Sequence, residues 1–230
     1  MGVRSPSKGE NALKELQSRK HQGTLSVIYL DVTKDDSVEA AIKKIKSEFG
    51  RLDVLVNKAG IMVQDPPTRE SLHTIFVTNV FSILALTNAA LPLLQASNSP
   101  KVINVTSELG SITMKMDPGS PYHKMSGESY HVSKAALNML SACQAISFQG
   151  FGCKVWAYCP GYVVTDIAGV EERQRRRDRG AESLETSAQG ILEIVEGVMV
   201  KIESSSLNTG SSILGRLAYV GHQSTILRYR

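Results

Sequence analysis

The sequence predicts an α/β fold in which a doubly wound parallel sheet is covered by helices on both faces. Short apolar runs of strand length alternate along the chain with longer segments whose apolar residues recur at helical spacing. This alternation is typical of parallel sheets, because each crossover helix covers one face of the sheet. A length of 230 residues and a hydrophobic content of 42% fit one domain with a sizeable core.

Each element follows from a local pattern. Helices are predicted over residues 36–49, 69–94 and 129–148, the first of them capped by Asp36 and Ser37 and ended by Gly50. Buried strands are predicted at Leu25–Leu30, Leu52–Val56, Lys101–Val105 and Lys154–Tyr158. Ligands of such sheets bind at the carboxyl ends of the strands. We therefore expect functional residues just past these ends, at Asp31, Asn57, Ser107 and Pro160.

Composition narrows the function classes. The net charge of +4 is modest, so charge does not indicate a nucleic-acid partner. The three cysteines lack metal-ligand spacing and no secretory signal precedes them, which predicts a cytoplasmic protein with reduced thiols and no metal site. The apolar stretch Ile75–Leu94 contains Thr, Asn and Pro, which favours a buried helix over a membrane span. The Arg-rich segment Glu171–Arg179 is interpreted as a solvated face, with a nuclear-targeting or phosphate-binding patch as the alternative.

The most informative pattern is Tyr130 and Lys134, which lie one helical turn apart on one face of a predicted helix. A nearby ammonium favours the phenolate, so such a Tyr is expected to ionise below its usual pKa of about 10. It can then exchange a proton with a carbonyl oxygen that a Ser hydroxyl, here Ser107, holds in place. Because chance pairs at this spacing are frequent, the pair alone is weak evidence, and a surface Tyr packed on a Lys stem is the alternative.

With its neighbours, the pair gives the chain a specific resemblance. From about Val3 to about Val198, the sequence resembles the short-chain dehydrogenases/reductases, in particular their carbonyl-reductase-like branch. The matching segments occur in family order: Leu30–Val32, Asp53–Gly60, Thr78–Val80, Ser107, Tyr130 with Lys134, and Cys159–Asp166. The resemblance implies a Rossmann-like fold.

The resemblance also implies an activity, namely hydride transfer between a nicotinamide and a ketone or secondary alcohol. Tyr130 would be the acid in reduction and the base in oxidation, and Ser107 would bind the substrate oxygen. Lys134 would keep Tyr130 acidic and bind the nicotinamide ribose. Asn79 would hold a water beside Lys134, although by itself a helical Asn more often is a satisfied core amide.

Further residues are implied to bind the cofactor. Arg4, at the end of a strand, can pair with a 2′-phosphate, which favours NADP(H) over NAD(H); a solvated arginine is the alternative. The cofactor-binding set implied by the resemblance is Arg4, Asp31, Asn57, Ala59, Gly60, Tyr130, Lys134, Pro160, Val163 and Thr165. The loop between Gly110 and Tyr130 is expected to form part of the substrate rim or to be a surface insertion.

Two departures from the family pattern affect these expectations. No strand, Gly-rich turn and helix precede Arg4, so we expect a Rossmann-like sheet that is incomplete at the N-terminus and binds NADPH weakly. After Val198 the expected carboxyl-terminal strand is not evident. We therefore divide the chain into a truncated dinucleotide-binding domain over residues 1–198 and an atypical, disordered tail over residues 199–230.

Two hypotheses on function remain open at this point. In the first, the chain is an NADP-dependent short-chain reductase that acts on a small-molecule carbonyl or alcohol substrate. In the second, it is a reductase-like pseudoenzyme that acts as a scaffold or dimer partner through its two long helices. The resemblance implies a homodimer or homotetramer if the fold is complete. We expect neither a nucleic-acid partner nor a membrane.

Overall fold

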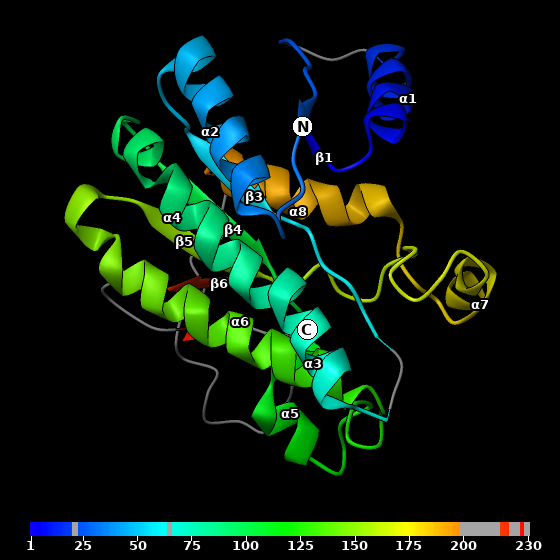
Figure 1. Ribbon diagram of the computed structural model, residues 1–230. Coiled ribbons are helices and arrows are strands. Elements are labelled where there is room, and N and C mark those ends of the chain that lie inside the picture. Colours follow the sequence, from blue (N-terminus) through cyan, green and yellow to red (C-terminus); the bar gives the residue numbers. More distant parts are fainter. Residues whose placement is uncertain (20–22, 64–65, 198–216, 221–225, 228–230) are drawn as a thin grey trace.

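The computed structural model describes residues 1–19, 23–63, 66–197, 217–220 and 226–227, and Figure 1 shows their arrangement. Two sheets are present among them. The first pairs β1 (Gly2–Val3) with β2 (Ile28–Tyr29) in parallel. The second has the order β3-β4-β5-β6-β7, with strands at Val54–Asn57, Lys101–Val105, Lys154–Tyr158, Leu217–Val220 and Ile226–Leu227. Strands β3, β4 and β5 are parallel, as predicted.

Strands β6 and β7 are a difference from the expectation. They add to β5 in antiparallel orientation, so the predicted absence of a strand after Val198 is wrong for these six residues. The rest of the predicted tail lies outside the described residues, and the proposed division into 1–198 and 199–230 stays a prediction. Polar residues surround Leu217–Val220 in the sequence, so the local pattern does not predict a strand there. The strand forms because it pairs with the buried strand β5.

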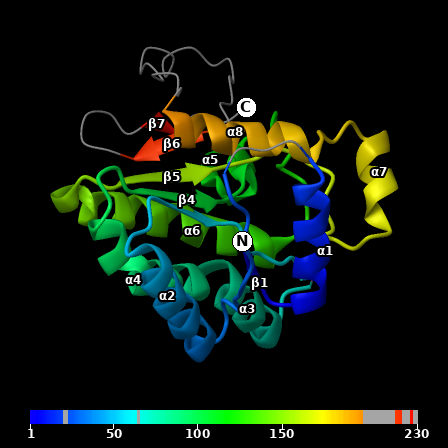
Figure 2. The same ribbon diagram turned by 90° about the horizontal axis from the view of Figure 1, so that it is seen from above.

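Helices cover both faces of the larger sheet, which confirms the predicted α/β class (Figures 1 and 2). Helix α2 (Asp35–Phe49), α4 (Ser82–Gln95) and α6 (Glu128–Ser147) lie on one side, and α8 (Leu184–Glu196) lies on the other. Helix α1 (Pro6–Gln17), which the pattern analysis did not identify, packs beside β1. Short helices fill the connections: α3 (Arg69–Phe76), η2 (Glu108–Gly110), α5 (Ile112–Met116), η3 (Gln149–Phe151) and α7 (Glu172–Asp178).

The alternation of side chains along the central strands divides the core in two. On β4, Val102 faces the layer of α4 and α6, where it packs with Leu94 and Phe148. Its neighbour Ile103 faces the opposite layer and packs with Tyr158 and Ile194 of α8. A strand buried on both faces must be apolar at successive positions, which explains the continuous apolar runs of the sequence.

The helix predicted over residues 69–94 is continuous but not uniform. Between α3 and α4, Val77–Phe81 form a π-helical turn, η1, with Asn79 at its centre. Such insertions occur often at functional sites, because they aim one side chain differently from a regular helix. The segment Arg69–Gln95 contains an 18-residue window with a mean hydropathy of 1.7, so it is long and apolar enough to cross a membrane by composition. Its contacts with α2, α6, β3 and β4 account for this apolar character in a core helix.

Candidate active site

Three of the four predicted catalytic residues, Ser107, Tyr130 and Lys134, meet at the carboxyl end of β4. Ser107 follows that strand, and Tyr130 and Lys134 occupy the first turns of α6. The Ser107 hydroxyl lies near the Tyr130 phenol, close enough to lower its pKa. The Lys134 ammonium lies over the Tyr130 ring, with Nζ 5.5 Å from the ring centroid. Both α6 side chains are buried, with exposed fractions of 8% for Tyr130 and 3% for Lys134.

The electrostatics of Tyr130 differ from the expectation. Burial above all, and the neighbouring Cys159 to a smaller extent, raise the pKa of Tyr130 to about 12. The Ser107 hydroxyl and the charge of Arg176 lower the pKa, but they do not outweigh burial. The prediction that Tyr130 ionises below its usual pKa is therefore wrong, because burial outweighs the groups that favour the phenolate. Tyr130 is a protonated hydroxyl at neutral pH.

Lys134 is a buried cation in the same site. Burial lowers its pKa from the ordinary 10.5 to about 8, because a desolvated ammonium is less stable than the neutral amine. Its Nζ donates one hydrogen bond, of 2.9 Å, to the carbonyl of Val105. An ammonium has three donors, so two remain for hydroxyl groups of a bound molecule.

Asn79 reaches this site from the π-helical turn, where it is completely buried. Its side-chain oxygen accepts a hydrogen bond of 2.8 Å from the Ile61 amide, and its nitrogen donates to the Ile61 carbonyl and to Ser133 Oγ. The side-chain amide therefore fastens the segment after β3 to α6, as a satisfied core amide does. The predicted role in holding a water stays a prediction.

Gly60 shows how closely these groups approach one another. A Cβ atom on Gly60 would lie 3.4 Å from Asn79 Oδ1 and 3.7 Å from Lys134 Nζ. Neighbouring Ala59 is exposed beside it. Both distances from the Gly60 Cβ position are ordinary van der Waals distances, so the chain after β3 passes directly beside Lys134 and Asn79.

Asn57, the last residue of β3, is placed differently from the expectation. Its side chain is buried and donates to Thr87 Oγ1 at 3.0 Å and to Asn104 Oδ1 at 2.8 Å. Asn104 in turn donates to Ser141 and Gln144 of α6. Because this network occupies the amide nitrogen of Asn57, contact with a cofactor through that group would break core hydrogen bonds.

The residues expected at the adenosine end lie together after β1 and β2. Asp31 accepts hydrogen bonds from the amide and hydroxyl of Thr33, which lower the pKa of its carboxyl. The charges of Lys34 and Arg4 lower this pKa further, so the exposed Arg4 lies within electrostatic reach of Asp31. This end of the site combines one carboxylate with cations.

The segment after β5 carries the remaining predicted residues, Pro160, Val163 and Thr165. Val163 is buried, and its carbonyl accepts a hydrogen bond of 3.1 Å from Arg176 Nη1. The guanidinium of Arg176 also stacks over the Tyr162 ring, 5.4 Å from its centroid. One member of the Arg-rich run thus supports the site, a role that the solvated-face interpretation missed.

Sequence reasoning also missed a buried pair beside Ser107. The Tyr122 hydroxyl donates to the carboxylate of Glu108, and the Glu108 amide donates to Cys159 Sγ at 3.3 Å. The pair fastens the loop between Gly110 and Tyr130 next to the catalytic group. The sequence does not predict the pairing of Tyr122 with Glu108, because the path of the loop alone brings the two residues together.

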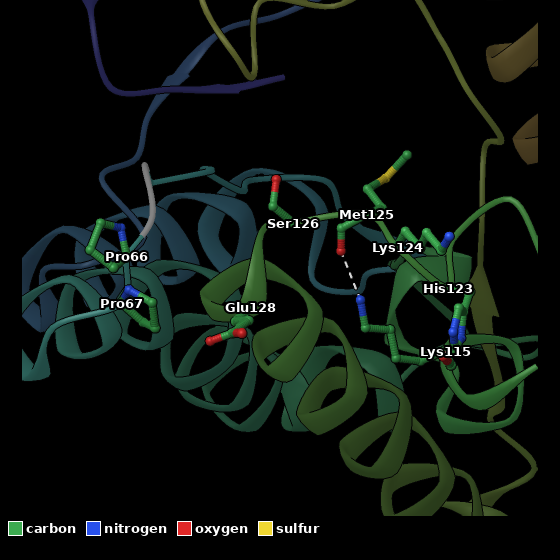
Figure 3. A pocket seen from close by; sticks show the side chains of 8 residues that line it. All are labelled: Pro66, Pro67, Lys115, His123, Lys124, Met125, Ser126 and Glu128. Carbon is green, nitrogen blue, oxygen red and sulfur yellow. Dashed lines mark hydrogen bonds between the residues drawn. The ribbon is translucent and has the colours of Figure 1, made fainter. Parts of the chain in front are cut away.

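The same loop borders a surface pocket of ≈ 470 Å³ (Figure 3). Pro67 lies on one side of it, Lys115 and Lys124 of the loop lie on the other, and Glu128 lies at the start of α6 between them. Lys115 Nζ donates to the Met125 carbonyl at 2.7 Å, which ties the two ends of the loop together. The loop is therefore held by its own contacts, and its role as part of the substrate rim stays a prediction.

Comparison with known proteins agrees with this geometry. The short chain dehydrogenase family matches residues 2–176. The chain is 33% identical over 217 residues to short-chain dehydrogenase anuI of Penicillium roqueforti, which covers 91% of this chain and 86% of that protein. It is 32% identical over 182 residues to short-chain dehydrogenase/reductase tropE of Talaromyces stipitatus, covering 73% and 68% of the two chains.

Solved structures give the same assignment. The NADPH-bound carbonyl reductase from chicken fatty liver superposes with a TM-score of 0.69 at 28% identity, over 84% of this chain and 78% of that one. The structure of Sniffer from Caenorhabditis elegans gives a TM-score of 0.59 at 29% identity, over 70% of this chain and 72% of that one. With its α/β fold and the grouped Ser107, Tyr130 and Lys134, the chain belongs to the short-chain dehydrogenase/reductase family of oxidoreductases.

Proposed function

We propose that this chain transfers hydride between NADP(H) and a ketone or secondary alcohol, with Tyr130 as the acid or base. The observation that carries the proposal is the meeting of the Tyr130 phenol with the buried ammonium of Lys134, with the Ser107 hydroxyl nearby. A carbonyl oxygen placed between the two hydroxyls would find two donors. The similarity to an NADPH-bound carbonyl reductase supports the choice of substrate class and cofactor.

The residues fit a nicotinamide cofactor at its nicotinamide and ribose end. The Lys134 ammonium has two donors left for ribose hydroxyls. The backbone at Gly60 passes close to this ammonium. The pyrophosphate end fits less well, because in the described part of the chain no Gly-rich turn joins a strand to a helix N-terminus; β1 passes through Arg4 and Ser5 into α1.

The chain's own residues perform the proton transfer. When bound, a nicotinamide cofactor supplies the hydride for the carbonyl carbon. Tyr130, protonated at neutral pH because its pKa is about 12, donates its proton to the carbonyl oxygen. Ser107 orients that oxygen by a hydrogen bond, and the Lys134 ammonium stabilises the negative charge left on the phenol. The high pKa of Tyr130 favours reduction over oxidation near neutral pH.

Preference for NADP(H) is proposed to come from Arg4, since a guanidinium can bind a 2′-phosphate by charge-assisted hydrogen bonds. Fluorescence titration of NADPH and NADH tests this. Wild type is expected to bind NADPH more tightly, and Arg4→Ala is expected to lose about tenfold in NADPH affinity with little change for NADH. Equal losses for both cofactors would remove Arg4 from the preference.

A second candidate, a non-catalytic dimer partner, is favoured by one observation. The outer faces of α4 and α6 expose large apolar side chains on adjacent helices, namely Phe81, Leu84, Val132, Met139 and Ile146. An apolar stripe over two long helices suits packing against a second copy. We propose a homodimer through this surface, which is compatible with either function.

A ketone-reduction assay at saturating NADPH distinguishes the two candidates. NADPH oxidation that depends on an added ketone supports the reductase. The dimer-partner function is favoured by three results together: NADPH binds, the chain dimerises, and no aliphatic, aromatic or steroid ketone is reduced.

A further inference from the structure

The segment after β5 brings an exposed aromatic ring close to the catalytic group. The Glu108 amide, one residue after Ser107, donates to Cys159 Sγ at 3.3 Å, so this segment starts beside that group. Gly161 then turns the chain with a φ of 79°, a value that favours glycine. Tyr162 follows and is 42% exposed. Its ring is therefore accessible to a molecule bound at the catalytic group.

The loop that contains α7 is fastened to the same segment. The Val164 amide donates to the Glu182 carbonyl at 3.0 Å, and the Glu182 amide donates to the Tyr162 carbonyl at 2.8 Å. Within the loop, Arg176 Nη1 donates to the Val163 carbonyl at 3.1 Å. These hydrogen bonds hold the loop against the segment after β5, and they fix the position of Arg176.

Arg176 differs from its neighbours on α7. Arg173 and Arg175 are exposed and form ion pairs with carboxylates, whereas the ion pairs of the described residues do not include Arg176. Arg176 is half-buried, and its guanidinium stacks over the Tyr162 ring, 5.4 Å from the ring centroid. A guanidinium has five N–H donors, and the hydrogen bond to Val163 uses one of them. The remaining donors suit an anion.

The charge of Arg176 reaches the reacting groups. It is one of the influences that lower the pKa of Tyr130, so the guanidinium and the phenol lie within electrostatic reach of each other. Because Tyr130 is protonated at neutral pH, it does not neutralise this cation. The positive charge therefore favours a substrate that carries a negative charge near its carbonyl group.

We propose that Arg176 selects ketones that carry a carboxylate, with the carboxylate on the guanidinium and the intervening carbons on the Tyr162 ring. A carboxylate can accept two parallel hydrogen bonds from a guanidinium, which gives both affinity and orientation. The stacked side chain is already ordered, so it loses little freedom on binding. This inference rests on the proposed reductase function, because it names the substrate class of the same site.

Isothermal titration calorimetry with the full chain tests the preference without turnover, in the presence of the oxidised cofactor NADP⁺, which cannot reduce a ketone. The two probes are an aryl ketone with a carboxylate two methylene groups from the carbonyl, and the methyl ester of this acid. We expect the acid to bind at least about tenfold more tightly than the ester, because hydrogen bonds between charged groups contribute at least about that factor.

Substitutions on α7 assign the preference to one side chain. Arg176→Gln removes the charge and keeps a donor for the Val163 carbonyl, so the ratio of the two affinities should fall close to one. Arg176→Lys keeps the charge without the planar fork and should restore part of the ratio. Arg175→Gln is the matched control, since Arg175 is an exposed residue of the same helix, and it should keep the wild-type ratio. In a ketone-reduction assay, Arg176→Gln should raise the KM of the acid more than that of the ester.

The outcomes separate this inference from the reductase function. A preference for the acid that only the Arg176 substitutions reduce supports the inference; if neither ketone is reduced, the reductase function alone fails. Equal binding of acid and ester by wild type, no measurable binding of either, or the same loss of both in Arg176→Gln overturns the inference, even if both ketones are reduced. A loss in Arg176→Gln confined to NADPH affinity, measured by fluorescence titration, would assign the guanidinium to a phosphate of the cofactor and would also overturn it.

Discussion

Replacing Lys134 by methionine is expected to stabilise the folded protein near neutral pH while abolishing its proposed activity. Lys134 is 3% exposed, and burial lowers its pKa from 10.5 to about 8. A group that binds its proton less tightly in the folded state lowers the stability at every pH below its folded pKa. Methionine has a similar shape and carries no charge that must be desolvated.

The size of the effect follows from the pKa. A difference of 10.5 − 8 = 2.5 units corresponds to about 3 kcal/mol of stability lost below pH 8. The lost hydrogen bond to the Val105 carbonyl offsets about 1 kcal/mol. Lys134→Met should therefore be about 2 kcal/mol more stable than wild type near pH 7. The advantage should disappear by about pH 10, because wild-type stability rises as pH passes from 8 towards 10.5.

Urea denaturation, monitored by circular dichroism near pH 7 and near pH 10, measures the difference in stability between Lys134→Met and wild type. Lys154→Met is the matched control, since Lys154 is an exposed lysine on β5 and its replacement should change stability by less than about 0.5 kcal/mol. A Lys134→Met protein that is less stable than wild type near pH 7, or a difference that does not depend on pH, would refute the reasoning.

Three further predictions concern the site and its surroundings. Tyr122→Phe removes the donor to the buried Glu108 carboxylate and should lower the free energy of unfolding, measured by urea denaturation, by about 1–3 kcal/mol. The same change at the exposed Tyr29 should leave the free energy of unfolding unchanged. Equal stability of the two variants would contradict the role of the pair. Steady-state ketone reduction should slow as pH rises through about 8, where Lys134 loses its proton, and a rate that rises through this range would contradict the role of the ammonium. Met139→Lys should convert the proposed dimer to a monomer in light scattering, and an unchanged mass would exclude the α4 and α6 surface.

The elements that the sequence predicted best are those in which the local pattern of apolar residues is enough to determine the structure. Lys101–Val105 and Lys154–Tyr158 are observed at the predicted boundaries, because a short apolar run between turns has no other way to be buried. Ser107, Tyr130 and Lys134 come together for a similar reason. A residue at the end of a parallel strand and two residues one helical turn apart are placed by regular geometry.

The features that were missed depend on tertiary context. Burial sets the direction of the Tyr130 pKa shift. The spacing of Tyr130 and Lys134 in the sequence does not show how deeply the two side chains are buried. The pairing of Tyr122 with Glu108 depends on the path of a loop, and that of Arg176 with Val163 depends on the packing of α7. The side chain of Asn57 points into a core network that joins two strands to two helices.

Single-turnover oxidation of NADPH by wild type and Tyr130→Phe, at saturating NADPH and ketone, tests the central assignment most directly. The hydroxyl of Tyr130 is the proposed proton donor, so its removal should slow the reaction by about 10²–10⁴-fold. The folded state should persist, because the ring and its contact with Lys134 are retained. A Tyr130→Phe protein that oxidises NADPH at the wild-type rate would contradict the assignment.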